Sequence, residues 1–302
     1  MEKIINIQDK NYPKLLKEIG KDAPKQLYYK GNWSDIFSAQ GGPASGGKNC
    51  LAVVGSRHMT TYGKQVVEKI VSEVAAAGIT IVSGFMYGVD AEAHKTALQV
   101  GGRTIAVMPC GIDLIHPEYQ QDLYAEILDN KGLIISEYEG STQPVLWTYP
   151  RRNRIVAGLS KAALIIEAGE KSGSLITAEF AKKYKRKVFV VPGPITSENS
   201  KGIMQLIKEG AEAVSSAQDI LKYYNTLGFR SSFALDPKGP RDSGIPESSL
   251  EIKIINQLQR EALGIDMISR NLGLPAAKMG TILSMMQLKG QIKQEGNKYY
   301  VN

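Results

Sequence analysis

The chain has 302 residues, of which 43% are hydrophobic, and its formal net charge is +7. Such a chain can bury the core of one large domain and a small one, and its positive charge favours an anionic partner. No apolar run reaches the roughly 18 residues that a membrane-spanning helix needs, and the first residues lack the apolar core of a signal peptide. We therefore expect a cytoplasmic protein with no membrane partner.

Metal and nucleophile motifs are missing from the sequence. The two cysteines, Cys50 and Cys110, lie far apart, and His58, His94 and His116 follow no regular ligand spacing. No serine lies in a G-x-S-x-G turn. We therefore expect no metal, no cofactor and no catalytic residue.

Residues 1–48 are expected to form an extension that packs on the main sheet. A short amphipathic helix is predicted at 12–19 and a turn with a strand at 23–31. The glycine-rich segment 40–48 is typical of a loop. It is not an ATP-binding phosphate loop, because Lys48 is followed by Asn49 where that motif needs Ser or Thr.

Residues 49–226 alternate between strand and helix patterns. Strands are predicted at 51–54, 79–82, 104–107, 133–135, 163–166 and 187–191, and helices at 62–77, 89–100, 119–129, 153–157, 174–184 and 202–208. The alternation predicts an α/β fold with a mostly parallel, doubly wound sheet. Ligands of such sheets bind beyond the carboxyl ends of the strands.

Two glycine-containing turns follow the first two of these strands. The first is Gly55-Ser56-Arg57, which is not the G-x-G-x-x-G of NAD-dependent dehydrogenases. The second runs from Ser83 to Asp90. Its glycines allow close approach of an anion, and Asp90 is expected to cap the following helix.

Further strand ends carry basic and hydroxyl groups. Arg151, Arg152 and Arg154 lie at the N-terminus of a helix predicted to start at residue 153, where positive charge opposes the helix dipole and costs stability unless an anion binds. The turn 172–174 (SGS) opens another predicted helix, and its backbone N–H groups suit phosphate oxygens. This number of turns that could bind phosphate favours a polymer with repeating phosphates as the ligand, rather than a single mononucleotide.

The segments GSR, SGFMYGVDAEAH, AVMPCGIDLIHP, YPRRNRIVAGLS, IEAGEKSGSLITAEFA and VFVVPGPI occur in unbroken order. This set resembles the DNA-processing protein A (DprA, also called Smf) family from about residue 12 to 224. The resemblance implies an extended Rossmann-like fold and no catalysis. It also implies a protein that binds and protects incoming single-stranded DNA and loads the recombinase RecA onto it in natural transformation and recombination.

The resemblance also implies the DNA-binding residues. By position these are Gly55, Ser56, Arg57, Ser83, Gly84, Tyr87, Gly88, Asp90, Arg151, Arg152, Asn153, Arg154, Lys161, Ser172, Gly173 and Ser174. At residues 85–87 (FMY) the family usually has leucine, alanine and arginine, so one arginine is missing and Tyr87 is expected to stack on a base. Phe85, Trp147 and Tyr149 are further stacking candidates.

The last quarter of the chain has a different character. Residues 227–247 are predicted to be a linker and 248–302 a winged-helix domain, with helices at 250–258, 265–272 and 275–288 and a hairpin at 290–301. The third helix has only Lys278 and Lys289 as basic groups, which favours a protein contact or weak DNA binding over reading of a major groove. The segment 203–224, with Ile and Leu positions that look exposed, resembles the part with which family members form a homodimer and contact RecA.

Two other functions stay open. A nucleotide-processing Rossmann enzyme, similar to the nucleoside monophosphate phosphoribohydrolases, would use Glu167 and Glu179, although the P-G-G-x-G-T-x-x-E signature of those enzymes is missing. A pure protein-binding scaffold would leave the arginine-bearing turns without a role.

Overall fold

The computed structural model describes residues 3–37, 49–228, 247–258, 261–273, 276–288 and 290–301. The glycine-rich segment 40–48 and most of the predicted linker lie outside the described residues. The chain divides into two compact units, Met1–Leu235 and Asp236–Asn302. No helix in the described ranges is both long and apolar enough to span a membrane.

The first unit is built on a nine-stranded sheet in the order β1-β2-β6-β5-β4-β3-β7-β8-β9. All neighbours from β6 to β9 pair in parallel, whereas β1 and β2 pair antiparallel at one edge. The strands are β1 (Lys3–Asn6), β2 (Gln26–Gly31), β3 (Cys50–Val54), β4 (Thr80–Ser83), β5 (Thr104–Gly111), β6 (Leu133–Tyr138), β7 (Ala162–Ile165), β8 (Lys187–Val190) and β9 (Glu212–Ala213). The predicted α/β class with a mostly parallel sheet is confirmed. The strands β1 and β9 were not predicted from the sequence; both are short and mostly exposed.

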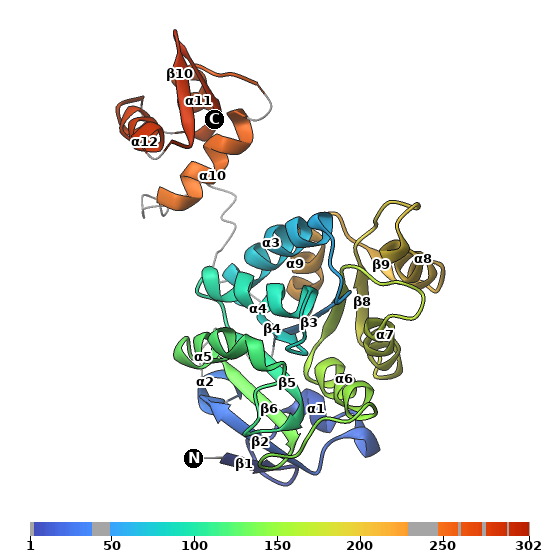
Figure 1. The fold of residues 1–302 in the computed structure, drawn as a ribbon. Coiled ribbons are helices and arrows are strands. Elements are labelled where there is room, and N and C mark those ends of the chain that lie inside the picture. The colour runs from blue at the N-terminus through green and yellow to red at the C-terminus, as the bar shows by residue number, and fades with distance from the viewer. Residues whose placement is uncertain are drawn as a thin grey trace. The chain divides into compact units, whose positions relative to one another are not determined.

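Helices cover both faces of this sheet (Figure 1). One face carries α3 (Thr61–Ala76), α4 (Val89–Gln99), α5 (Gln121–Asp129) and α9 (Ala217–Thr226); the other carries α1 (Lys14–Lys17), α6 (Thr148–Leu159), α7 (Gly173–Lys183) and α8 (Lys201–Lys208). The shorter elements are α2 (Trp33–Phe37) and the 3-10 turns η1 (Gly20–Asp22), η3 (Glu118–Gln120) and η4 (Glu198–Ser200). The central strands β3, β4 and β5 are buried along their whole length, as expected for strands covered on both faces.

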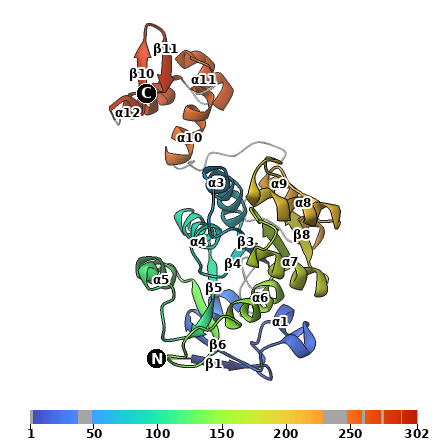
Figure 2. The ribbon, with the colours of Figure 1, turned by 45° about the vertical axis from the view of Figure 1, so that its right-hand side comes forward.

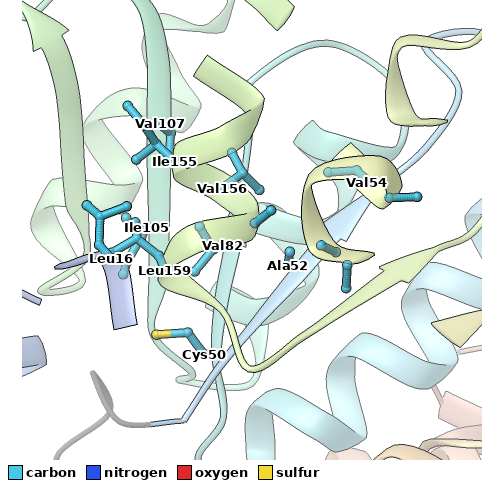
Figure 3. Close-up of a cluster of buried hydrophobic side chains, with 14 of the residues drawn as sticks. Leu16, Cys50, Ala52, Val54, Val82, Ile105, Val107, Ile155, Val156 and Leu159 are labelled. Atoms are coloured by element: carbon cyan, nitrogen blue, oxygen red, sulfur yellow. The ribbon is translucent and has the colours of Figure 1, made fainter. Parts of the chain in front are cut away.

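Helix α6 is anchored by an apolar stripe. Figure 3 shows Ile155, Val156 and Leu159 packed over residues of β3, β4 and β5, with Leu16 of α1 alongside. Gly158 lies on the same helix, and a Cβ there would come within 2.8 Å of the Leu16 side chain. The close packing of α1 against α6 therefore depends on this glycine.

The N-terminal residues join the sheet directly. β2 extends it by pairing antiparallel with β6, and β1 pairs with β2. The Tyr12 hydroxyl donates to the Pro24 carbonyl oxygen at 2.7 Å, which ties the start of α1 to the segment before β2.

The apolar positions of residues 203–224 are not exposed in the single chain. Ile203 and Leu206 of α8 pack into the core on one face, and Ile220 and Leu221 of α9 on the other. The expectation of exposed Ile and Leu side chains there is wrong, because these residues cover the end of the sheet.

The second unit has the predicted winged-helix elements (Figure 2). They are α10 (Glu247–Leu258), α11 (Ile265–Leu272), α12 (Ala276–Leu288), β10 (Ile292–Glu295) and β11 (Lys298–Val301), and the two strands form an antiparallel hairpin. A core of its own joins α10, α11 and α12, with Ile254, Ile268 and Leu283 among its buried members. The Lys278 and Lys289 side chains lie outside the described residues.

Candidate nucleic-acid interface

The strand order of the sheet changes direction beside β3. The chain builds the sheet outward from β3 through β4, β5 and β6, then returns to place β7 on the other side of β3. Ligands of open α/β sheets bind at such a switch point. A cleft of about 420 Å³ lies there, lined by residues 54–58, Met86, Asp90, 149–150, 152–153, 171–174 and 176–177. We call it the first cleft.

The turns after β3 and β4 are packed against each other. Gly88 has a φ of +79°, and the Val89 N–H donates to the Ser56 carbonyl oxygen at 3.2 Å. A Cβ on Gly88 would collide with the Ser56 and Arg57 backbone. Gly88, not Asp90 as predicted, is the N-cap of α4, and Asp90 lies one residue inside the helix.

Arg152 is a buried link between strands. Its side chain donates to the carbonyl oxygens of Gly84 and Val107, and the residue is only 4% exposed. A Cβ on Gly84 would lie 2.5 Å from the Arg152 guanidinium and 2.6 Å from the Asp90 carboxylate, so only glycine fits between them. Burial lowers the pKa of Arg152 to about 10 and raises the pKa of Asp90, and the two charges partly offset these shifts.

Helix α6 begins at Thr148, not at residue 153 as predicted. Pro150 is its third residue, where the missing N–H would have no helical partner in any case. The Arg154 guanidinium donates to both carboxylate oxygens of Glu137 at 2.6 Å, and Arg151 donates to the same carboxylate at 3.1 Å. Arg151 and Arg154 therefore share the Glu137 countercharge, and the inference that these two arginines need a bound anion is wrong.

Arg57 is an exposed cation at the first cleft. Its guanidinium carbon lies 5.8 Å from the centre of the Tyr87 ring and 5.5 Å from the centre of the Tyr149 ring. The Tyr149 hydroxyl is 2.7 Å from His116 Nε2, which fixes the ring position. Burial, followed by the charge of Arg57, lowers the pKa of His116, so this imidazole is neutral at pH 7. Arg57 is thus held between two aromatic faces without a carboxylate partner among the described residues.

The start of α7 forms the opposite wall. Ser172 is the N-cap, and its hydroxyl accepts from the Ser174 N–H at 3.4 Å. The Asn153 amide donates to the Gly173 carbonyl oxygen at 3.2 Å, which joins α6 to this turn. A helix N-terminus attracts anions through its free N–H groups and its dipole. The exposed Lys171 also lines this wall; we missed it, although it directly precedes the SGS turn.

Several residues predicted to bind DNA do not line the first cleft. Ser83 is buried and donates to the Val53 carbonyl oxygen, and Lys161 lies at the opposite edge of the sheet, where its ammonium donates to the Asn49 side chain. Phe85 is fully buried in the core, so its prediction as a base-stacking residue is wrong. Tyr87 is 36% exposed and Trp147 56%, so both rings remain accessible.

The carboxylates of the alternative enzyme hypothesis lie apart from the first cleft. Glu167 is buried and accepts from the Thr60 N–H at 2.9 Å, at the start of α3. Glu179 is exposed on α7, and neither residue lines the first cleft. Within the described residues, no group of three or more His, Cys, Asp or Glu side chains could hold a metal ion.

Comparisons with known proteins identify the family of this chain. The sequence matches the family described as DNA recombination-mediator protein A over residues 3–225 and the DprA winged helix domain over residues 238–298. The protein Smf of Synechocystis is 34% identical over 97% of this chain and 78% of its own length, and DprA of Streptococcus pneumoniae is 41% identical over 72% of both chains.

Two solved structures are similar as well. The X-ray structure of DprA from Streptococcus pneumoniae has a TM-score of 0.66 at 40% identity and 73% coverage of both chains. A structure from Helicobacter pylori, on the single-stranded DNA binding mode of its DNA processing protein A, has a TM-score of 0.65 at 32% identity, covering 76% of this chain and 98% of that one. The chain therefore belongs to the DNA recombination-mediator protein A (DprA/Smf) family.

Proposed function

We propose that this chain binds single-stranded DNA in the first cleft. The observation that carries the proposal is the position of Arg57, an exposed guanidinium between the Tyr87 and Tyr149 rings, across from the N-terminus of α7. Proteins that bind single strands combine a cationic groove with aromatic faces on which bases stack. The α7 turn adds backbone N–H groups suited to a phosphate.

This combination favours a single strand over a duplex. Stacking on a tyrosine requires an unpaired base, and every base has a face that can stack. The first cleft is lined by glycine and serine turns, by Arg57 and by the start of α6. The arginines of α6 are bonded within the protein, Arg152 to carbonyl oxygens and Arg151 and Arg154 to Glu137, so this helix does not offer a row of free arginines to a major groove. We therefore expect little sequence preference.

We further propose that the chain protects incoming DNA, loads RecA onto it and acts as a homodimer in transformation and recombination. Membership of the recombination-mediator family supports this part. The test is RecA filament assembly on an oligonucleotide that is already covered by a single-strand-binding protein. Assembly should be faster with this chain than without it, and an unchanged rate would contradict the loading role.

The binding test is fluorescence anisotropy of labelled oligo-dT and of a matched duplex across a salt series. We expect tighter binding to oligo-dT, with log K falling by about 0.7 per decade of salt for each phosphate contacted. Arg57→Ala should weaken binding and reduce this slope by about 0.7, because one cation is lost. Lys69→Ala is the matched control, since Lys69 is exposed on α3 and does not line the first cleft.

Each other outcome of this test has a definite meaning. Preference for the duplex would move DNA binding to the winged-helix unit. If neither DNA binds, the proposal fails and nucleotide hydrolysis becomes the leading hypothesis. A salt slope that Arg57→Ala leaves unchanged would remove Arg57 from the phosphate contacts.

A further inference from the structure

A second cleft lies on the other side of α6. It has a volume of about 700 Å³ and is walled by residues 21–23 and 25, by Gln26 and Tyr28 of β2, by Glu137 and Tyr138 of β6, and by Arg151 and Arg154 of α6. Tyr149, Arg152 and Asn153 of the same helix line the first cleft. Helix α6 therefore separates two clefts of the first unit.

The second cleft carries excess positive charge. Its lining holds four cations (Lys21, Lys25, Arg151, Arg154) and two carboxylates (Asp22, Glu137), which leaves a charge of +2. Both carboxylates already have partners within the protein: Glu137 is bonded to the two arginines, and Asp22 to Lys183 and the Tyr184 hydroxyl. Hydrogen bonds from Lys183 and Tyr184 lower the pKa of Asp22.

Lys21 and Lys25 supply the unpaired charge. Both are exposed, and neither forms an ion pair with any residue that the structure describes. An anion in this cleft would therefore gain their attraction without breaking an existing ion pair.

Aromatic rings connect the two clefts. Trp147, which immediately precedes α6, has the Arg151 guanidinium carbon 5.6 Å from its ring centre. Its other neighbour is Tyr138 of the second cleft, whose ring centre lies 6.1 Å away in an edge-to-face arrangement. Tyr149 of the first cleft follows two residues later. The N-terminal end of α6 thus presents an exposed ring and a cation between the clefts, the same pairing that Arg57 makes with Tyr87.

We infer that the second cleft holds a further stretch of the same single strand, which crosses the start of α6 over Trp147 and places phosphates near Lys21 and Lys25. The inference rests on the proposed function of the first cleft. The repeated combination of cation and ring on both sides of α6 favours a continuous strand over an isolated anion or an acidic peptide.

The test is the affinity of the full chain for a length series of labelled oligo-dT, measured by anisotropy at fixed salt. In the unchanged protein, affinity should rise stepwise once the oligonucleotide is long enough to pass α6. In the Lys21→Glu/Lys25→Glu variant the step should disappear. Its affinity for long oligonucleotides should fall about tenfold or more, and its affinity for the shortest oligonucleotides that bind should not change. The salt slope for long oligonucleotides should fall by about 1.4, which is two phosphate contacts.

The matched control is Lys69→Glu/Lys95→Glu, which makes the same charge change on exposed positions of α3 and α4 that line neither cleft. It should keep the step. The inference is overturned if the Lys21/Lys25 variant keeps the step, or if it loses affinity equally at every length, as a general field effect would. If the unchanged chain binds no oligo-dT at all, the proposed function fails together with the inference; binding without a length step overturns the inference alone.

Discussion

The buried Arg152 provides the sharpest test of how this site is held together. Arg152→Met removes the guanidinium but keeps much of the side-chain volume. The change leaves the Gly84 and Val107 carbonyl oxygens without their donor and the buried Asp90 carboxylate without its nearest cation. Leaving a buried charge without its compensating charge costs about 3–5 kcal/mol. We expect a loss of that size in the free energy of unfolding of the first unit.

A second substitution separates charge from packing. In Asp90→Asn/Arg152→Met no charge remains buried at this position, so the double variant should be more stable than the sum of the two single changes predicts. Coupling energies between neighbouring groups are about 0.5–3 kcal/mol. If the two substitutions acted only by leaving cavities, their losses of unfolding free energy would add. A double variant that is more stable than this sum therefore points to the interaction between the two charges.

Urea unfolding followed by tryptophan fluorescence measures both values. The chain has two tryptophans, Trp33 and Trp147, and both lie in the first unit, so the signal reports that unit. Lys69→Met on the exposed face of α3 is the control and should change the unfolding free energy by less than about 0.5 kcal/mol. A loss of unfolding free energy below about 1 kcal/mol for Arg152→Met, or strict additivity of the two single changes, would refute the conclusion that the charge of Arg152 stabilises this site.

Two further predictions concern buried positions. Burial lowers the pKa of His94 to about 3, so below about pH 6.5 only the unfolded chain takes up this proton. Stability should therefore fall as the pH drops from 6.5 toward 3, and His94→Gln should reduce the slope by up to about 1.4 kcal/mol per pH unit in urea unfolding; equal slopes would contradict this. Gly88→Ala should cost more unfolding free energy than Gly101→Ala and should weaken oligo-dT binding, because both positions have positive φ but only a Cβ on Gly88 meets another backbone. Equal losses of unfolding free energy would mean that the positive φ alone, and not the collision with the Ser56 and Arg57 backbone, sets the cost of the substitution.

The sequence alone determined the order of the strands from β3 to β8 and of the helices between them, and the positions of most turns. Buried strands of a parallel sheet have continuous apolar runs, and the glycine and serine turns that follow β3, β4 and β7 are local features of a few residues. The clearest local error was the start of α6. Tyr149-Pro150 is also compatible with a turn. In the fold, the first turn of α6 is tied to other elements by the Arg151–Glu137 ion pair and by the contact of the Tyr149 hydroxyl with His116, and neither partner is close in the sequence.

The roles of the arginines were decided only by the tertiary structure. In the sequence, Arg151, Arg152 and Arg154 form one basic run. In the fold, successive residues of α6 point in different directions, so Arg152 is buried against β4 and β5 while Arg151 and Arg154 meet Glu137 of β6.

Arg57, by contrast, stays exposed between the Tyr87 ring, from the turn after β4, and the Tyr149 ring, from the first turn of α6. Whether a charge is available to a ligand depends on which countercharges the fold brings to it. Those groups come from distant parts of the chain, so local sequence patterns determine the turns of this site but not its free charges.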